Sequence, residues 1–262
     1  MRMEVLISTM HQKNLSLAYK MNLQTDALII NQSDKEVKQL IEINKNKIRM
    51  LSFIERGLTK SRNKALVNSD ADICIIADDD LIYEDNYERT ILDAYEKYPD
   101  ASIIVFDVPS TNINRPTRTL KEGKINFLHT LKIASFQITF KKVNINKENI
   151  GFHELFGAGA KYTCGEEHIF LAEAIKKGLK LIYVNKKIAT VNHIDSTWFS
   201  GYNKALFKTK GAMFYEMSPL LSPLLITQFS IRKWNFYRKD IKFLTSIRYM
   251  LNGMSEYKKL IK

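Results

Sequence analysis

The sequence predicts an α/β fold with a mixed, mostly parallel sheet flanked by helices, followed by a helical extension at the C-terminus. Three observations support this fold class. Short apolar runs alternate with helix-length segments through the first 200 residues, which is the pattern of successive strand–helix–strand units. The apolar run 73–77 stops abruptly at three carboxylates, as a buried parallel strand does at a ligand-binding sheet edge. Residues 201–262 instead mix aromatic and basic side chains, so we divide the chain into residues 1–200 and 201–262.

Each element is expected from its own residues, because apolar β-branched runs predict strands and the segments between them predict helices. The expected strands are residues 3–9, 27–30, 48–53, 73–77, 101–108, 133–143, 181–184 and 188–191. The expected helices are residues 14–23, 36–44, 61–67, 85–98 and 169–177, with Thr59 as an N-cap and Gly178 as a C-terminal stop. Residues 109–128 predict a long polar loop. The alternation of Ser135, Gln137 and Thr139 predicts a solvated face on the strand that contains them.

Composition narrows the class of protein. A chain of 262 residues with 45% apolar residues can bury one main core and carry an appendage. Its two cysteines, Cys74 and Cys164, are too few for a disulfide scaffold and favour a reducing compartment. Neither a signal-peptide pattern nor a stretch of about 20 apolar residues is found, so we expect a cytoplasmic protein.

The positive charge is concentrated at the C-terminus. The formal net charge is +12, and from Gly201 onward there are 12 Lys or Arg against three acids, which gives nine of the twelve excess charges. A basic segment serves nucleic acid, anionic lipid or solubility. A nucleic-acid-binding protein is therefore one alternative, although the sequence shows no zinc or RNA-binding signature.

The aspartate triplet is the most informative motif. Asp78, Asp79 and Asp80 repel one another unless a cation neutralises them, and ligands that are all oxygen suit Mg²⁺ or Mn²⁺. The alternative is a solvated acidic turn before the next helix. The glycine-flanked helix start at Gly57, with Arg62 in its first turns, is typical of phosphate or nucleotide contacts, although such an arginine is more often on the surface.

Two later segments carry further candidates. Gly157 and Gly159 permit close backbone approach to a ligand, and Glu166 and Glu167 begin the next helix, where acids also balance the helix dipole. His193 directly follows a strand and could complete a metal site with the aspartates, whereas a lone histidine is more often structural.

The order of these motifs across residues 3–198 resembles that of glycosyltransferase family two, which has the Rossmann-like GT-A fold. The resemblance implies an inverting enzyme of the hexosyltransferase class that moves a sugar from a nucleoside diphosphate donor, usually UDP-linked, to an acceptor hydroxyl. A metal-dependent nucleotidyltransferase is a second alternative, but the chain lacks the glycine-rich lysine loop of P-loop enzymes.

The resemblance also implies roles for individual residues. The aspartate triplet matches the Asp-X-Asp motif, in which Asp80 binds the Mn²⁺ or Mg²⁺ ion and Asp78 contacts ribose or shares the ion. Nucleotide contacts fall on Thr9, Asn31, Gln32, Arg62, Asp78 and Asp79. Glu167 falls at the position of the base, with Glu166 preceding it, and His193 matches a third metal ligand. Glu167 replaces the aspartate of most relatives, so the base role stays open between the two glutamates, and Asn31 and Gln32 replace aspartates.

The C-terminal 62 residues lie outside the resemblance. Their helices combine cations with large apolar residues, a composition suited to the interface of an anionic membrane. This would fit a glycan or lipid-linked oligosaccharide acceptor in capsule or exopolysaccharide assembly at the inner face of the cell membrane. Packing on the catalytic part or in a homo-oligomer interface is the other interpretation.

Overall fold

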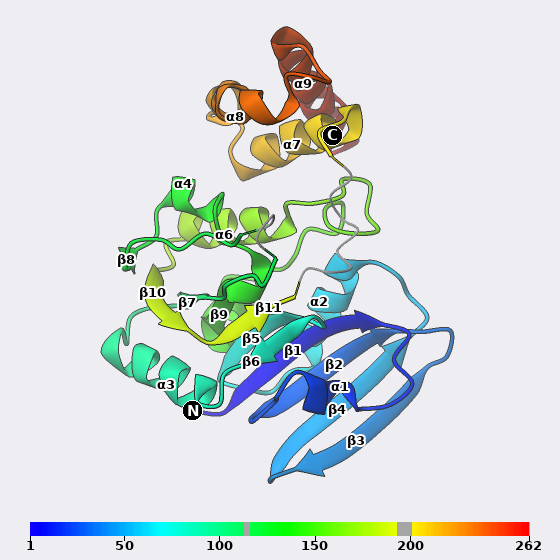
Figure 1. Cartoon of the computed structure of the whole chain (residues 1–262), viewed down its shortest axis with the longest axis vertical. Helices are drawn as coiled ribbons and strands as arrows, with labels where there is room; N and C mark the ends of the chain where they lie inside the picture. The colour runs from blue at the N-terminus through cyan, green and yellow to red at the C-terminus, as the bar shows by residue number, and fades with distance from the viewer. Residues whose placement is uncertain (113–115, 193–200, 262) are drawn as a thin grey trace.

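The structure, a computed structural model, describes residues 1–112, 116–192 and 201–261. A nine-stranded mixed sheet is flanked by helices, and the three last helices form a bundle at one end of the molecule (Figure 1). The expected α/β fold is confirmed. The strands are β1 Met3–Met10, β2 Asp26–Gln32, β3 Val37–Ile43, β4 Asn46–Phe53, β5 Ile73–Asp78, β6 Leu81–Tyr83, β7 Ile103–Asp107, β8 Gly123–Lys124, β9 Ile138–Lys141, β10 Leu181–Lys187 and β11 Ala189–Val191. The helices are α1 Leu17–Lys20, α2 Leu58–Asn68, α3 Tyr87–Lys97, α4 Phe127–Thr130, α5 Lys142–Lys147, α6 Glu166–Lys176, α7 Lys204–Met217, α8 Ser222–Tyr237 and α9 Phe243–Leu260.

The strand order places the informative segments side by side. The sheet runs β3-β4-β2-β1-β5-β9-β7-β10-β8, and the neighbours β4, β2, β1 and β5 are parallel. Ser8 is in register with Asp78, and Thr9 with Asn31. Because parallel strands end at the same edge, the polar residues that follow β1, β2 and β5 meet there.

Both faces of the sheet are buried at the central strands β1, β2 and β5, which explains their continuous apolar runs. Alternate residues point to opposite faces. Val5, Ile7 and Ile75 pack in one core with Tyr87 and Ile91 of α3. The residues between them pack in a second core against α2 and α6; that core includes Leu6, Cys74, Ile76, Leu66 and Phe170.

Residues 36–44 are a strand and not the expected helix. Val37–Ile43 of this segment form β3, which pairs antiparallel with β4 at the end of the sheet. The two-residue turn is made by Asn44 and Lys45, both with positive φ, of 50° and 72°. Such a turn matches the twist of a hairpin, and asparagine tolerates it well. The alternation of exposed and half-buried residues along β3 fits a strand with one covered side.

The expected solvated face on residues 133–143 is also wrong. Ser135 and Gln137 lie in a short 3₁₀ turn, Thr139 lies in β9, and all three are buried. The Gln137 amide donates to the Phe106 carbonyl at 3.1 Å, and the Thr139 hydroxyl donates to the Ile104 carbonyl at 2.8 Å. Polar residues on a buried strand are tolerated here because each has a hydrogen-bond partner.

Smaller differences concern element ends. The helix expected over 14–23 is reduced to α1, and the loop 109–128 contains β8 and the start of α4. Thr59 is not an N-cap, because α2 already begins at Leu58, with Gly57 as its cap at φ 125°. Gly178 does end α6, in a left-handed conformation with φ 78°.

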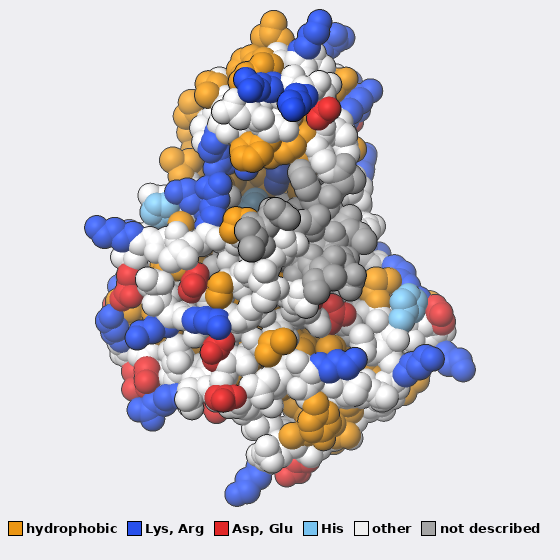
Figure 2. Space-filling model, in the orientation of Figure 1, with side chains coloured by type: hydrophobic (Ala, Val, Ile, Leu, Met, Phe, Trp, Pro, Cys, Tyr) orange, Lys and Arg blue, Asp and Glu red, His pale blue; other side chains and the backbone are white. Residues whose placement is uncertain are grey.

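The C-terminal bundle packs on the α/β part. Phe207 and Met213 of α7 share a core with Phe156, Tyr162 and Ile169. Figure 2 shows Lys and Arg side chains together with hydrophobic ones over the surface of this bundle. No helix in the described part of the chain is long and apolar enough to cross a bilayer.

Two glycines allow α7 and α9 to cross in backbone contact. A Cβ on Gly211 would overlap the Met250 carbonyl, and one on Gly253 would overlap the Lys208 carbonyl. We therefore expect Gly253→Ala to lower the free energy of unfolding by about 3 kcal/mol, since the overlap is with backbone that cannot move aside. Asn252→Ala, at the exposed neighbouring position, should leave it nearly unchanged. Urea unfolding of both variants measures the difference, and equal stabilities would show that the helices can separate.

Candidate functional site

The predicted nucleotide edge is assembled from three strands. Thr9 ends β1, Asn31 and Gln32 end β2, and the aspartate triplet ends β5. The Thr9 hydroxyl donates to Asp79 Oδ2 and accepts from the Gln12 amide at 3.1 Å. The structure therefore brings these sequence-predicted residues together at one edge of the sheet, as the parallel pairing requires.

Asn31 and Gln32 hold the backbone of this edge. The Asn31 side chain is fully buried; it accepts from the Gln12 N–H and donates to the Gln12 carbonyl, both at 2.9 Å, and donates to the Ser52 hydroxyl at 3.0 Å. Gln32 Oε1 accepts from the Gly57 N–H at 2.7 Å. Gln12 is half-buried beside Thr9 and was missed from the sequence, because a single glutamine after a strand carries no pattern of its own.

The aspartate triplet is crowded with negative charge. Burial first, and then the Asp78 and Asp79 carboxylates, raise the pKa of Asp80 to about 7. Asp78 Oδ1 accepts from Arg62 at 2.9 Å, and Asp79 Oδ2 accepts from the Thr9 hydroxyl. Neighbouring carboxylates disfavour the charged form of such a group, and a cation bound between the carboxylates would offset this repulsion.

The donor set fits a cation that is shared with a phosphate ligand. Among residues 1–112, 116–192 and 201–261, no group of three or more His, Cys, Asp and Glu side chains is arranged to hold a metal ion. Mg²⁺ typically uses one or two carboxylates together with substrate phosphates and water. The triplet can offer these carboxylates. His193, the expected third ligand, lies outside the described residues. Its neighbour Asn192 donates its N–H to the Asp80 carbonyl at 2.9 Å.

Arg62 connects the aspartates to the glutamates. It lies in α2, and its side chain is only 2% exposed. Its guanidinium donates to Asp78 at 2.9 Å, to Glu166 Oε1 at 2.8 Å and to the Ser135 hydroxyl at 2.9 Å. The sequence left Arg62 between a surface residue and a nucleotide contact. In the structure it is a buried residue that bridges two acidic groups from distant parts of the chain.

The glycine-rich segment packs closely against the same groups. Gly57 and Gly157 both have positive φ, 125° and 104°. A Cβ on Gly157 would meet Thr59 Cγ2 at 3.0 Å and Glu166 Cδ at 3.3 Å, and the Ala158 carbonyl accepts from the Leu58 N–H at 3.1 Å. We expected the backbone of this segment to approach a ligand closely. In the structure it approaches the start of α2 and Glu166 instead.

The two glutamates differ in their surroundings. The Glu166 side chain is 7% exposed and is bound to Arg62, and burial, followed by the charge of Glu167, raises the pKa of Glu166 to about 7 although Arg62 opposes the shift. The Glu167 side chain is 18% exposed, and its Oε1 lies 3.6 Å from His168 Nδ1. Burial lowers the pKa of His168 to about 3, so the imidazole is neutral and leaves Glu167 without an ionic partner there.

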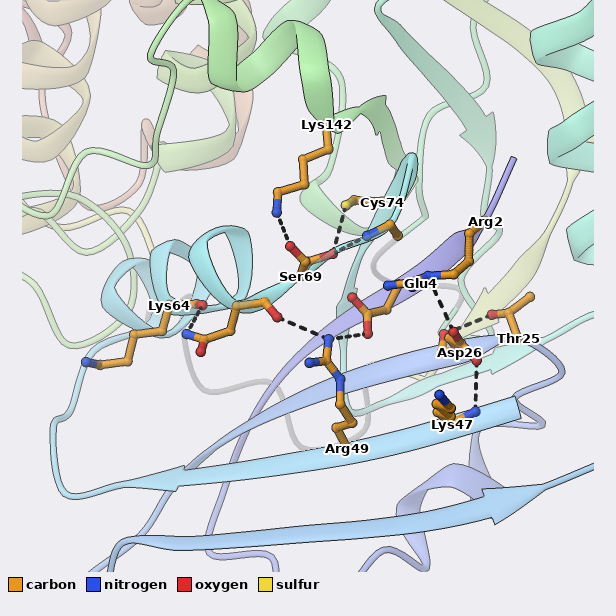
Figure 3. Close-up of polar contacts among 12 residues, drawn as sticks. Arg2, Glu4, Thr25, Asp26, Lys47, Arg49, Lys64, Ser69, Cys74 and Lys142 are labelled. Atoms are coloured by element: carbon orange, nitrogen blue, oxygen red, sulfur yellow. Dashed lines mark hydrogen bonds and ion pairs between the residues drawn. The ribbon is translucent and has the colours of Figure 1, made fainter. Parts of the chain in front are cut away.

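A cavity of about 850 Å³ lies far from this site, at the amino ends of the strands, where it is lined by Met1, Asp72, Lys142 and Asn146 among others. The polar groups near it are largely paired with one another (Figure 3). Lys142 donates to the Ser69 carbonyl, and Arg49 is bound to Glu4 at 2.8 Å. We interpret these contacts as structural.

Comparison with protein-family models gives one match. The model described as Glycosyl transferase family 2 matches residues 28–162, about half of the chain. The match includes Arg62 and the aspartate triplet and stops before Glu166. No curated protein matches the chain by sequence.

Solved structures resemble almost the whole chain. The structure of S. aureus TarS residues 1–349 in complex with UDP-GlcNAc is 12% identical, with a TM-score of 0.69, over 98% of this chain and 80% of that one. The mannosyltransferase PcManGT from Pyrobaculum calidifontis, in complex with GDP-Man and Mn²⁺, is 9% identical, with a TM-score of 0.53, over 98% of this chain and 75% of that one. At these identities the likeness shows a shared fold.

Proposed function

Since the chain belongs to glycosyl transferase family 2 and is a glycosyltransferase, we propose that it moves a sugar from a UDP-linked donor to an acceptor hydroxyl with inversion. The observation that carries this proposal is the arrangement around Arg62. One terminal nitrogen of its guanidinium donates to Asp78, and the other donates to Glu166, which is next to Glu167. A diphosphate site and a base for the incoming alcohol would thus face one another.

On the donor side, we assign nucleotide contacts to Thr9, Asp78 and Asp79, and the metal contact to Asp80. Asn31 and Gln32 act through Gln12 and Gly57, whose backbones they fix. A bound Mn²⁺ or Mg²⁺ would offset the negative charge that develops on the diphosphate leaving group. Support comes from two structures of the same fold, which contain UDP-GlcNAc in one case and GDP-Man with Mn²⁺ in the other.

On the acceptor side, we assign the base to Glu167 and a positioning role to Glu166. Glu166 is committed to Arg62 and is nearly enclosed, whereas Glu167 is more exposed and is free of a charged histidine. A base must come within hydrogen-bond reach of the proton it removes. A single displacement by the alcohol would invert the anomeric centre.

The C-terminal bundle supports an acceptor at a membrane surface. Leu224 and Ile231 of α8 and Leu244 and Leu251 of α9 are exposed, between 40% and 76%. Arg248 lies on the same face of α9 as its two leucines, by helical spacing. Exposed apolar residues beside cations suit the interface of an anionic bilayer. We propose that the acceptor is a lipid-linked glycan of a surface polysaccharide, at the cytoplasmic face of the membrane.

Thermal unfolding in the presence of candidate donors tests the proposed function. UDP-sugars at 100 times Kd, with Mn²⁺, should raise stability by about 2.7 kcal/mol, because a ligand stabilises the state it binds. Asp80→Asn should lose the Mn²⁺-dependent part of this gain and keep its unfolding temperature without ligand. A protein that responds to no nucleotide sugar, or an Asp80→Asn variant that responds like the wild type, would contradict the proposal.

A further inference from the structure

A recess separates the C-terminal bundle from the α/β part, next to α6. Figure 2 shows this recess with Lys and Arg side chains at its edge. Lys210 of α7 lies close to the start of α6. Its Nζ is 3.8 Å from Met213 Sδ, and Met213 packs so tightly on Gly165 that a Cβ there would overlap the sulfur. Gly165 directly precedes Glu166, so the Lys210 ammonium lies at the end of the site that holds the glutamates.

One side of α8 packs into the core of the bundle, and the same side continues along the helix beyond that core. Leu225, Phe229, Arg232 and Phe236 follow one another at spacings of three and four, which places them along one side of the helix. Leu225 and Phe229 are buried, whereas Arg232 is exposed and Phe236 is 67% exposed. The Lys233 ammonium lies 4.9 Å from the centre of the Phe236 ring. The outer half of this stripe therefore presents cations and an aromatic ring to the recess.

Arg118 approaches the same group of cations from the loop between β7 and β8. Burial, and then the Arg118 guanidinium, hold the pKa of Arg232 below its usual range. The pKa of Lys233 is lowered by burial first and then by Arg232, Arg118 and Lys210. Lys233 therefore lies near Arg118, Lys210 and Arg232, and the four cations come from three separate parts of the chain.

No carboxylate in the described ranges forms an ion pair with any of these four cations. Other Lys and Arg residues have such partners: Arg49 pairs with Glu4, and Lys208 with Glu256. Arg232 and Lys233 are partly desolvated beside these like charges, which is unfavourable by itself, and an anion relieves it.

We propose that Arg118, Lys210, Arg232 and Lys233 bind a phosphate ester group of the acceptor. The role in the acceptor rests on the proposed function, while the anion site rests on the cations alone. Arginine and lysine together suit phosphate, which offers several charged oxygens. The exposed Phe236 ring would lie against a neighbouring sugar or polyol.

Equilibrium binding of sn-glycero-3-phosphoglycerol, a soluble phosphate diester, tests the site in the full chain at low ionic strength. The double variant Arg118→Ala/Arg232→Ala should bind it at least about tenfold more weakly than the wild type, since two charge-assisted contacts are lost. The matched control is Arg238→Ala/Lys239→Ala, which removes the same number of charges from two exposed residues that directly follow α8. The control should bind like the wild type, and UDP should bind equally to all three proteins.

Several results would overturn the proposal. One is a wild type that does not bind the soluble diester, and another is an equal loss in the control, which would indicate a diffuse charge effect. A parallel loss of UDP affinity would assign the cations to the donor. Binding seen with phosphatidylglycerol vesicles but not with the soluble diester would assign them to a lipid surface. Failure of the wild type to bind UDP, with diester binding intact, would instead contradict the proposed function and leave the anion site standing.

Discussion

Replacement of Glu167 by glutamine is expected to slow sugar transfer by about 10² to 10⁴-fold while the affinity for UDP stays unchanged. Glutamine keeps the size of the side chain and removes only the ability to accept a proton. The partly exposed position of Glu167, beside a neutral His168, leaves its carboxylate available to an incoming hydroxyl. Initial rates at saturating donor and acceptor, together with calorimetric titration of UDP, measure the two effects separately.

Glu166→Gln is the matched comparison. The raised pKa of Glu166, about 7, would suit a base, but its oxygen is bound to Arg62 and its side chain is 7% exposed. The position of a carboxylate decides whether it can act as the base before its pKa does, because a base that the acceptor cannot reach removes no proton. We therefore expect a smaller loss of transfer in Glu166→Gln than in Glu167→Gln. The reverse order of the two losses would exchange their roles.

The sheet and its polar edge could be predicted because they depend on local pattern. An apolar run such as 73–77 is buried on both faces wherever it lies in a parallel sheet, and the polar residues after it must then lie at the edge. The same logic places Thr9, Asn31 and the aspartates together, since the strands that end in them are neighbours. Family resemblance added the order of the motifs to this local information.

The features that were missed depend on partners far away in the chain. Residues 36–44 become a strand because β4 supplies an edge to pair with, and nothing within nine residues reveals that edge. The burial of Gln137 and Thr139 depends on carbonyl groups of β7. Arg62 is a bridging residue only because Asp78 and Glu166, 16 and 104 residues away, converge on it. Spacing along the chain carries no record of such convergence.

That convergence makes Arg62→Met the substitution with the largest expected effect on stability. The methionine would leave Glu166, and in part Asp78, as carboxylates without their buried counter-charge. Removal of one partner of a buried ion pair typically costs about 3–5 kcal/mol. We expect a loss of that order in the free energy of unfolding, together with loss of transfer, because both sides of the site depend on this guanidinium. Arg49→Met, which breaks the pair with Glu4 at the opposite edge of the sheet, should lose stability and keep its turnover number.

The deficit of Arg62→Met should also depend on pH in a defined direction. Glu166 has a folded pKa of about 7 against a usual 4.5, so the folded state binds more protons between these values. Stability then falls as the pH rises through this window. Without Arg62 the pKa of Glu166 rises further, so the deficit relative to the wild type should be constant below about pH 7 and should grow as the pH rises above it. Adding Glu166→Gln to Arg62→Met should reduce the deficit and its pH dependence, because it removes the unpaired charge. It should not restore transfer, because the bridge made by Arg62 is still missing. A deficit that stays constant above pH 7 would mean that the pKa of Glu166 does not change without its arginine, and that Arg62 supports the site by packing alone.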